Sequence, residues 1–269
     1  MSHETWIPDD AVLDRPSPAR IYDYLLGGFH NFEIDRLTTE QLLLITPHLR
    51  LTAQISRAFL RRVVRYLTLQ QIDQFLDIGS GIPTVGNVHE VAQSAIPSAR
   101  VVYVDIDPVA VAHSRAILVD NPRATAIRGD VRAPDDILNH AEVEELLDLS
   151  RPIAIVLATV MHYVPDDALA YAAVRRLREA MTPGSFLVIA HGTPETQPAD
   201  REKQLAEAMK RISSTRVRTA EEVLPFFEGL ELVEPGLVLT PLWHPEGPDD
   251  VGLDTPELSL SLVGVGRKP

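Results

Sequence analysis

The stretch from Ile72 to Pro108 limits the possible fold of this chain more than any other part of the sequence. In order, it contains an apolar run over 72–78, the turn Gly79-Ser80-Gly81, a helical pattern from about Thr84 to Ala95, and a second apolar run over 101–104 that ends at Asp105. A strand, a glycine turn, a helix and a second strand followed by an acid form the first half of a doubly wound nucleotide-binding fold. The sequence therefore predicts an α/β protein with a nucleotide-type ligand at this turn.

Two details of this stretch favour a cationic ligand over a pyrophosphate. A pyrophosphate-binding fingerprint needs a third glycine at position 84, where this chain has Thr84. Asp77 stands two residues before Gly79, and a carboxylate there attracts a cation and repels a phosphate. S-adenosylmethionine carries a sulfonium and an ammonium group, has no phosphate, and offers ribose hydroxyls that suit an acceptor such as Asp105. We therefore expect S-adenosylmethionine as the cofactor and S-adenosylhomocysteine as its product.

The sequences DIGSG (77–81) and YVDIDP (103–108) resemble motifs I and II of the class I S-adenosylmethionine-dependent methyltransferases. The resemblance implies that the first acid and the glycine turn line the methionine part of the cofactor, and that the acid after the second strand binds the ribose. The residues implied are Asp77, Gly79, Ser80, Gly81, Asp105 and Ile106. The family's usual third glycine is replaced by Pro83, which is compatible with the first turn of a helix.

The N-terminal segment SPARIYDYLLGGFHNFEIDR, together with MHYVPDD and the closing VGVGRKP, resembles an actinobacterial family known only as S-adenosyl methyltransferases without a settled substrate. Ser17 and Pro18 are a good N-cap and first residue for a helix that ends at Gly27-Gly28. Methyltransferases of class I commonly close the site with N-terminal helices, so the resemblance implies a lid, with Tyr22, Asp23 and Asn31 as contacts. The alternative is a capped helix and turn that only pack on the domain.

The carboxyl ends of the later predicted strands supply further candidates. The third strand, Ala124–Arg128, leads to Asp130, and the resemblance implies that this acid contacts the adenine amino group. We also expect the neighbouring Val131, and Thr159 after the fourth strand, to bind the cofactor. The alternative for Asp130 is a cap for the helix that starts near Pro134. These residues complete the expected cofactor site.

Two histidines are candidate general bases because a neutral imidazole can accept a proton near pH 7. His162 follows the fourth strand and His191 follows the fifth, Ser185–Ala190. His162 could instead pack beneath the cofactor or cap the helix from Asp166. The alternative is a phenol or a carboxylic acid as the methyl acceptor, which can react without either base. The tetrapeptide NPPY, which holds amino groups for N-methylation of adenine or glutamine, is absent.

The complete pattern predicts a Rossmann-like, doubly wound, seven-stranded and mostly parallel sheet. As in the class I fold, the strand order is expected to be 3-2-1-4-5-7-6 with the last strand antiparallel. Residues 1–70 are expected to form an N-terminal helical appendage, and residues 71–269 the cofactor-binding domain, with an insertion at about 192–217 that lines the acceptor pocket. The arginines of the helix Leu49–Leu69 are interpreted as a solvated face: Arg57, Arg61, Arg62 and Arg65.

Composition excludes several classes of function. The chain has 269 residues, no cysteine and a formal charge of −13, so it has no disulfide, thiolate metal site or thiolate nucleophile, and a nucleic-acid substrate is disfavoured. Its nine histidines show no HExxH spacing, so no metal is expected. No apolar run approaches the ~20 residues that span a bilayer, and the N-terminus does not resemble a signal peptide, which predicts a cytoplasmic protein without membrane contact.

We therefore expect a methyltransferase that acts by in-line displacement on the oxygen or nitrogen of an unidentified acceptor. A small-molecule acceptor is favoured because the N-terminal helices and the insertion would enclose it. One alternative is an NAD-dependent oxidoreductase, which explains Asp105 but leaves Asp77 without a role. The other is a non-catalytic protein that binds S-adenosylmethionine. The sequence leaves the oligomeric state open.

Overall fold

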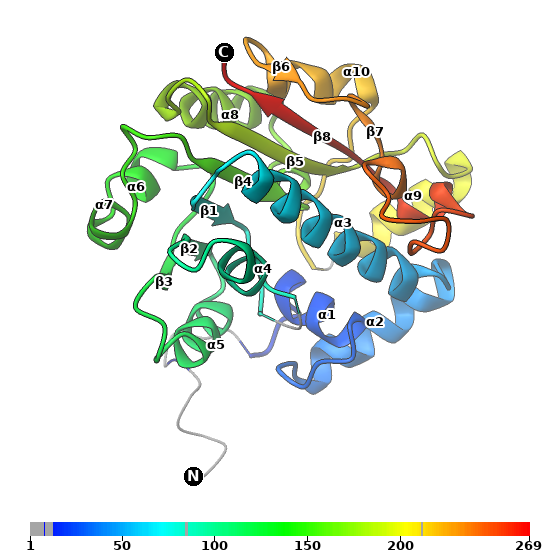
Figure 1. Cartoon of the computed structure of the whole chain (residues 1–269). Helices are drawn as coiled ribbons and strands as arrows, with labels where there is room; N and C mark the ends of the chain where they lie inside the picture. Colours follow the sequence, from blue (N-terminus) through cyan, green and yellow to red (C-terminus); the bar gives the residue numbers. More distant parts are fainter. Residues whose placement is uncertain (1–7, 9–12, 84–85, 211) are drawn as a thin grey trace.

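The computed structural model describes residues 8, 13–83, 86–210 and 212–269, and in this part of the chain eight strands form one sheet (Figure 1). The strands are β1 (Gln74–Ile78), β2 (Arg100–Asp105), β3 (Ala124–Arg128), β4 (Ala154–Ala158), β5 (Phe186–Gly192), β6 (Glu231–Leu232), β7 (Val238–Leu239) and β8 (Ser261–Arg267). Their order is β3-β2-β1-β4-β5-β8-β6, and β7 also pairs with β8. Strands β1 to β5 run parallel and β8 is antiparallel to β5, which confirms the predicted doubly wound sheet.

The sheet differs from the prediction at one edge, where the predicted sixth strand consists of the two short strands β6 and β7. Leu232 pairs with Gly266 and Val238 pairs with Val263. Five residues, 233–237, therefore separate β6 from β7, whereas two residues separate their partners on β8. The extra residues include Pro235, which has no N–H to donate to a ladder. The edge strand is interrupted there, and this adds an eighth strand.

The helices also follow the predicted order. They are α1 (Pro18–Leu25), α2 (Glu33–Ile45), α3 (Leu49–Leu69), α4 (Val88–Ala95), α5 (Pro108–Ile117), α6 (Pro134–Leu138), α7 (Ala141–Leu146), α8 (Asp167–Ala180), α9 (Ala199–Met209) and α10 (Ala220–Val223), with short 3₁₀ turns at Met161–Tyr163, Leu224–Phe227, Thr240–Leu242 and Pro256–Ser259. The predicted start of α4 at Thr84 lies outside the described residues. The helix begins at Val88 because Asn87 and Glu90 form a capping box there.

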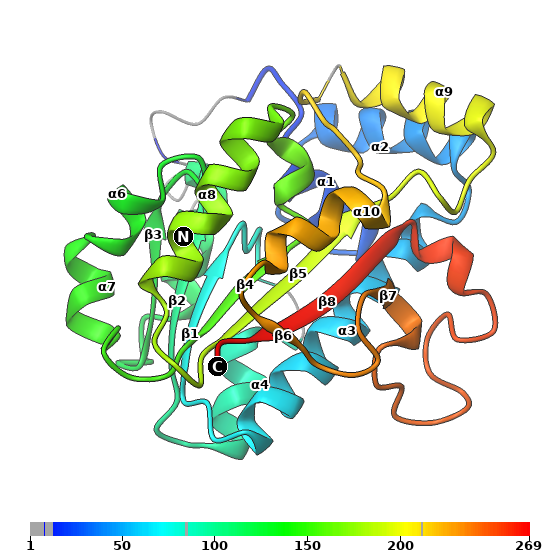
Figure 2. The ribbon, with the colours of Figure 1, turned by 90° about the horizontal axis from the view of Figure 1, so that it is seen from above.

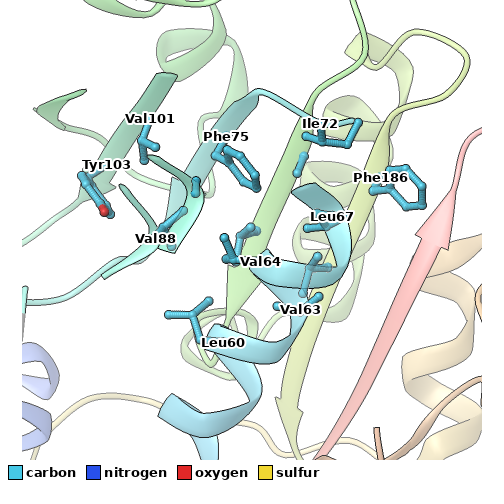
Figure 3. Packing of buried hydrophobic residues seen from close by; sticks show 14 of the residues in the cluster. Leu60, Val63, Val64, Leu67, Ile72, Phe75, Val88, Val101, Tyr103 and Phe186 are labelled. Carbon is cyan, nitrogen blue, oxygen red and sulfur yellow. The ribbon is translucent and has the colours of Figure 1, made fainter. Parts of the chain in front are cut away.

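Helices cover both faces of the sheet, as Figures 1 and 2 show. One buried cluster joins the sheet to α3, α4 and α5, and the other joins it to α6, α7, α8 and α10. Successive strand residues point to opposite faces, so Phe75 belongs to the first cluster and its neighbour Leu76 to the second. In Figure 3, α3 presents Val64 and Leu67 to the sheet. Full burial of each such side chain contributes about 1.5–3 kcal/mol.

The N-terminal helices form a smaller cluster next to the sheet. Ile21 and Leu25 of α1, Leu42 of α2 and Ala53 of α3 are buried there, and Leu205 of α9 packs against them. Helices α2 and α9 are in contact and lie side by side in Figure 2. Helix α3 is shared, because its first half contributes to this cluster and its second half packs on the sheet. The boundary predicted at residue 70 stays a prediction, but α3 connects the two parts.

Candidate functional site

A cavity of about 720 Å³ lies at the carboxyl ends of strands β1 to β5. Residues that follow all five strands contribute to its wall, which is where open α/β sheets bind ligands. The predicted site residues that line it are Tyr22, Asp77, Gly79, Ser80, Gly81, Asp105, Ile106, Asp130, Val131, Thr159 and His162. The structure thus brings together nearly all of the predicted site, while the contact of each residue with a cofactor stays a prediction.

The glycine turn after β1 is held by backbone contacts with β2. Gly79 and Gly81 have φ angles of 76° and 66°, a region that favours glycine. A Cβ atom on Gly79 would lie 2.4 Å from Cγ2 of Val160, so only glycine fits at this position. The N–H groups of Gly79 and Ser80 donate to the Val104 carbonyl at 2.7 and 3.1 Å. The turn is therefore held in one conformation, and it forms part of the cavity wall.

Asp105 connects the second strand to this turn. Its carboxylate accepts hydrogen bonds from the backbone N–H groups of Gly81 at 2.7 Å and Asp107 at 2.9 Å. Burial raises the pKa of Asp105 to about 6, although these hydrogen bonds oppose the shift. Each carboxylate oxygen accepts one of the two bonds and keeps a further lone pair. The side chain can therefore hold the turn and accept two hydroxyl groups from a ligand.

Asp77 is a buried carboxylate at the end of β1. It is 4% exposed and lines the cavity, and no hydrogen bond reaches its carboxylate from the described part of the chain. Burial raises the pKa of Asp77 to about 7; the charge of Arg57 opposes this shift and that of Asp105 adds to it. A cationic group in the cavity would restore the ionised form. An ammonium-bearing cofactor fits this site, because it supplies both the missing charge and the missing donors.

Asp130 and Thr159 line the same cavity, and hydrogen bonds within the protein hold both of them in place. The Asp130 carboxylate accepts from Nε and the backbone N–H of Arg132, both at 2.9 Å, and these contacts lower its pKa. The alternative prediction, that Asp130 caps the next helix, is wrong, because the N-cap residue of α6 is Ala133 and no side chain caps this helix.

Thr159 has a φ of 60°, which costs energy for a β-branched residue. Its N–H donates to the Ala190 carbonyl at 2.9 Å.

His162 lines the cavity and carries an unsatisfied nitrogen. Its Nδ1 atom is buried and has no hydrogen-bond partner within the described residues. Burial, followed by the neighbouring His191 and Arg218, lowers the pKa of His162 to about 3. The ring is therefore neutral at pH 7 and accepts protons weakly. This geometry favours binding of a polar ligand group over proton abstraction from a weak acid.

His191 has a structural role, which corrects its assignment as a candidate base. It is fully buried, and the cavity wall does not include it within the described residues. Its Nε2 atom accepts from Nη1 of Arg218 at 3.0 Å, and its Nδ1 atom therefore donates to the Gly192 carbonyl at 2.8 Å. Burial lowers the pKa of His191 to about 4. With both nitrogens occupied and no access to the cavity, this side chain cannot take a proton from a ligand there.

Two of the three predicted lid contacts hold the turn between α1 and α2 instead. The Asp23 carboxylate, which is 1% exposed, accepts from the His30 N–H and from Nδ2 of Asn31, both at 2.8 Å. Asn31 also donates to the Gly28 carbonyl at 2.9 Å. Neither Asp23 nor Asn31 is among the described residues of the cavity wall, whereas Tyr22 is. The expected cofactor contacts of Asp23 and Asn31 are therefore corrected to a role in holding the turn between α1 and α2.

Sequence reasoning missed several residues of the cavity wall. Arg57, interpreted as part of a solvated face, lines the cavity and donates to Oδ1 of Asn87 at 3.3 Å. Ser17, expected only as a helix cap, also lines the cavity and donates from its hydroxyl to Asp107. The insertion also lines the cavity with Gln197, Met209, Ile212, Ser213, Thr215, Arg216 and Val217, and its role as part of an acceptor pocket stays a prediction.

Two searches of the described residues gave negative results. No group of three histidine, aspartate or glutamate side chains is placed to hold a metal ion. No helix in the described ranges has the length and apolar character required to cross a membrane.

Comparisons with known proteins agree with this geometry. A family model described as S-adenosyl methyltransferase matches residues 4–269. A candidate methyltransferase from Thermobifida fusca YX is 42% identical with a TM-score of 0.91, and the match covers 98% of this chain and 99% of that one. A DUF574 family protein from Streptomyces avermitilis MA-4680 is 37% identical with a TM-score of 0.90, covering 96% and 99%.

A more distant match shows the fold alone. It is an O-methyltransferase family protein from Burkholderia thailandensis, 13% identical with a TM-score of 0.53, and it covers 84% of this chain and 58% of that one. None of the curated proteins compared with the chain matches it.

Proposed function

The chain belongs to the S-adenosyl methyltransferase family, and from this premise we propose that it methylates an oxygen or nitrogen of a small-molecule acceptor. Its cofactor is S-adenosylmethionine, so the alternative of a nicotinamide-dependent oxidoreductase is set aside. The observation that carries the proposal is the pair of buried carboxylates, Asp77 and Asp105, at one end of a cavity that continues between α1, α2 and α9.

The residues at the strand ends would bind the cofactor. Asp77 would bind its ammonium group, because the buried carboxylate has charge to neutralise and no donor of its own among the described residues. Asp105 would accept the ribose hydroxyls with its remaining lone pairs. Asp130 and Val131, which follow β3, would contact the adenine. When bound, the cofactor supplies a methyl group made electrophilic by its sulfonium.

The protein itself would contribute orientation and exclusion of water. Leu25 of α1, Leu42 of α2 and Leu205 of α9 give the far side of the cavity an apolar wall. An acceptor held between this wall and the glycine turn would have few orientations to explore, which removes much of the entropic barrier to transfer. The rigid turn at Gly79 keeps the position of the reacting groups fixed.

The shape of the cavity supports a small acceptor. Its volume of about 720 Å³ lies within the range of about 300–1,000 Å³ typical of small-molecule sites. Helices α1, α2, α3 and α9 all contribute to its wall, so a macromolecule would have to displace packed helices to reach the glycine turn. The formal charge of −13 also disfavours nucleic acid as the acceptor.

A turnover assay tests the proposal against a binding protein without activity. The purified protein is incubated with S-adenosylmethionine and the small-molecule fraction of an actinobacterial extract, and formation of S-adenosylhomocysteine is measured. We expect formation that depends on the extract and is lost in Asp77→Asn. Tight cofactor binding without turnover in any fraction would instead support the non-catalytic alternative.

A further inference from the structure

Three polar side chains of the cavity wall have unsatisfied buried atoms. They are Oε1 of Gln197, Nε of Arg216 and Nδ1 of His162, and all three residues line the cavity. Each of these atoms is buried and lacks a hydrogen-bond partner in the described chain. A buried polar atom without a partner costs about 1–3 kcal/mol, which a bound ligand would recover.

Other polar side chains of the cavity wall are already satisfied by the protein. The Thr52 hydroxyl donates to the Leu258 carbonyl at 2.7 Å, the Ser56 hydroxyl to the Thr52 carbonyl at 3.1 Å, and the Tyr22 hydroxyl to the Ala53 carbonyl at 3.2 Å. These groups have no need of a ligand. These satisfied groups differ from Gln197, Arg216 and His162, which form a polar recognition site distinct from the cofactor carboxylate Asp77.

Arg216 is fixed in place next to His162. Its backbone N–H donates to the His162 carbonyl at 2.8 Å, and its Nη2 atom contacts Asp167 at 2.9 Å and Glu222 at 2.7 Å. Two carboxylates therefore hold the guanidinium in place, and Nε is a buried donor without a partner among the described residues. Leu205, Met209 and Ile212 line the same cavity and supply an apolar surface.

We propose that Gln197, Arg216 and His162 bind the hydroxyl-bearing end of an apolar small molecule, which is the methyl acceptor. This inference rests on the proposed function and names its substrate class. Oε1 of Gln197 only accepts hydrogen bonds, whereas Nε of Arg216 only donates them. A hydroxyl group satisfies both, because it has one hydrogen and two lone pairs. A carboxylate would leave the buried Oε1 of Gln197 without a donor, and an ammonium group would leave Nε of Arg216 without an acceptor.

Three probes with the same aromatic body test this assignment: 2-naphthol, 2-methoxynaphthalene and 2-naphthoate. Each is titrated calorimetrically into the protein saturated with S-adenosylhomocysteine, so that no turnover occurs. We expect 2-naphthol to bind about tenfold or more tightly than the ether or the carboxylate, which is the effect of one hydrogen bond. Equal affinities, or no binding by any of the three probes, would overturn the proposal.

Variants of Gln197 separate recognition from folding. Gln197→Leu should remove the preference for 2-naphthol, and Gln197→Glu, which keeps an acceptor oxygen, should retain it. Gln204→Leu is the matched control, because Gln204 is an exposed glutamine on the same insertion. All variants should bind S-adenosylhomocysteine like the wild type. If the wild type does not bind S-adenosylhomocysteine, the proposed function is contradicted. If Gln197→Leu keeps the preference for 2-naphthol, only the assignment of Gln197, Arg216 and His162 to the acceptor is contradicted.

Discussion

The backbone N–H of Gly81 donates a 2.7 Å hydrogen bond to the carboxylate of Asp105, and this bond joins the turn after β1 to the end of β2. One acidic side chain thus fixes the glycine turn and faces the cavity. The two strands place their carboxyl ends side by side, since Ile78 pairs with Val104 in parallel register. The shape of the turn and the chemistry of the cofactor site therefore depend on the same carboxylate.

Asp105→Asn should weaken binding of S-adenosylmethionine by about 10²–10³-fold. The substitution removes the charge and one acceptor oxygen, and hydrogen bonds to charged groups contribute about 1.5–3 kcal/mol each. Calorimetric titration measures the effect. Asp120→Asn is the control, because Asp120 is an exposed acid beyond α5 and should leave the affinity unchanged. An affinity in Asp105→Asn within threefold of the wild type would contradict the assigned role.

Binding of S-adenosylmethionine should weaken as the pH falls below about 7. Burial raises the pKa of Asp77 to about 7, and an ammonium group binds only the ionised carboxylate. Below that pKa the dissociation constant should increase up to about tenfold per pH unit, with a further contribution below about 6 from Asp105. Titrations between pH 5.5 and 7.5 measure the slope. The part of the slope near pH 7 should be absent in Asp77→Asn, and a flat profile in the wild type would rule out this role for Asp77.

Asp77→Asn should stabilise the unliganded protein while it weakens cofactor binding. The pKa of Asp77 is raised in the folded state, so folding favours its protonated form, and stability from this group is lost as the pH rises from about 4 to about 7. A neutral amide avoids that loss. The melting temperature at pH 7.5 should increase without ligand, and the increase should shrink at pH 5. A lower melting temperature at pH 7.5 would show that the carboxylate has a structural partner.

Substitution of the two histidines should have opposite effects. His191→Phe leaves Arg218 Nη1 and the Gly192 carbonyl without their partner, and we expect a loss of about 1–3 kcal/mol in the free energy of unfolding. Cofactor affinity should not change in this variant. His162→Phe removes a buried unsatisfied nitrogen, so stability should be retained while methyl transfer decreases. Urea unfolding and turnover are measured on both variants. Loss of turnover in a His191→Phe variant that remains stable would contradict the structural role of His191.

The sequence was sufficient to predict the strands and the acids that follow them, because each is a local pattern. It could not distinguish His162 from His191, since both follow predicted apolar strands. The difference arises from Arg218, which is far from either in sequence and whose Nη2 pairs with Asp167 at 2.9 Å. Arg57 shares its polar helix face with Arg61, and only the packing of α3 beside the glycine turn brings Arg57 to the cavity. These positions depend on tertiary contacts that no local pattern contains.

Calorimetric titration with S-adenosylmethionine, S-adenosylhomocysteine and NAD, in the wild type and in Asp77→Asn, tests the central claim most directly. Both S-adenosyl compounds carry the ammonium group that Asp77 is proposed to bind, and NAD does not. We predict micromolar binding of the first two, strong weakening of both in Asp77→Asn, and no binding of NAD. Binding of NAD with unchanged affinity in the variant, or S-adenosyl binding that is insensitive to Asp77, would contradict this account of the site.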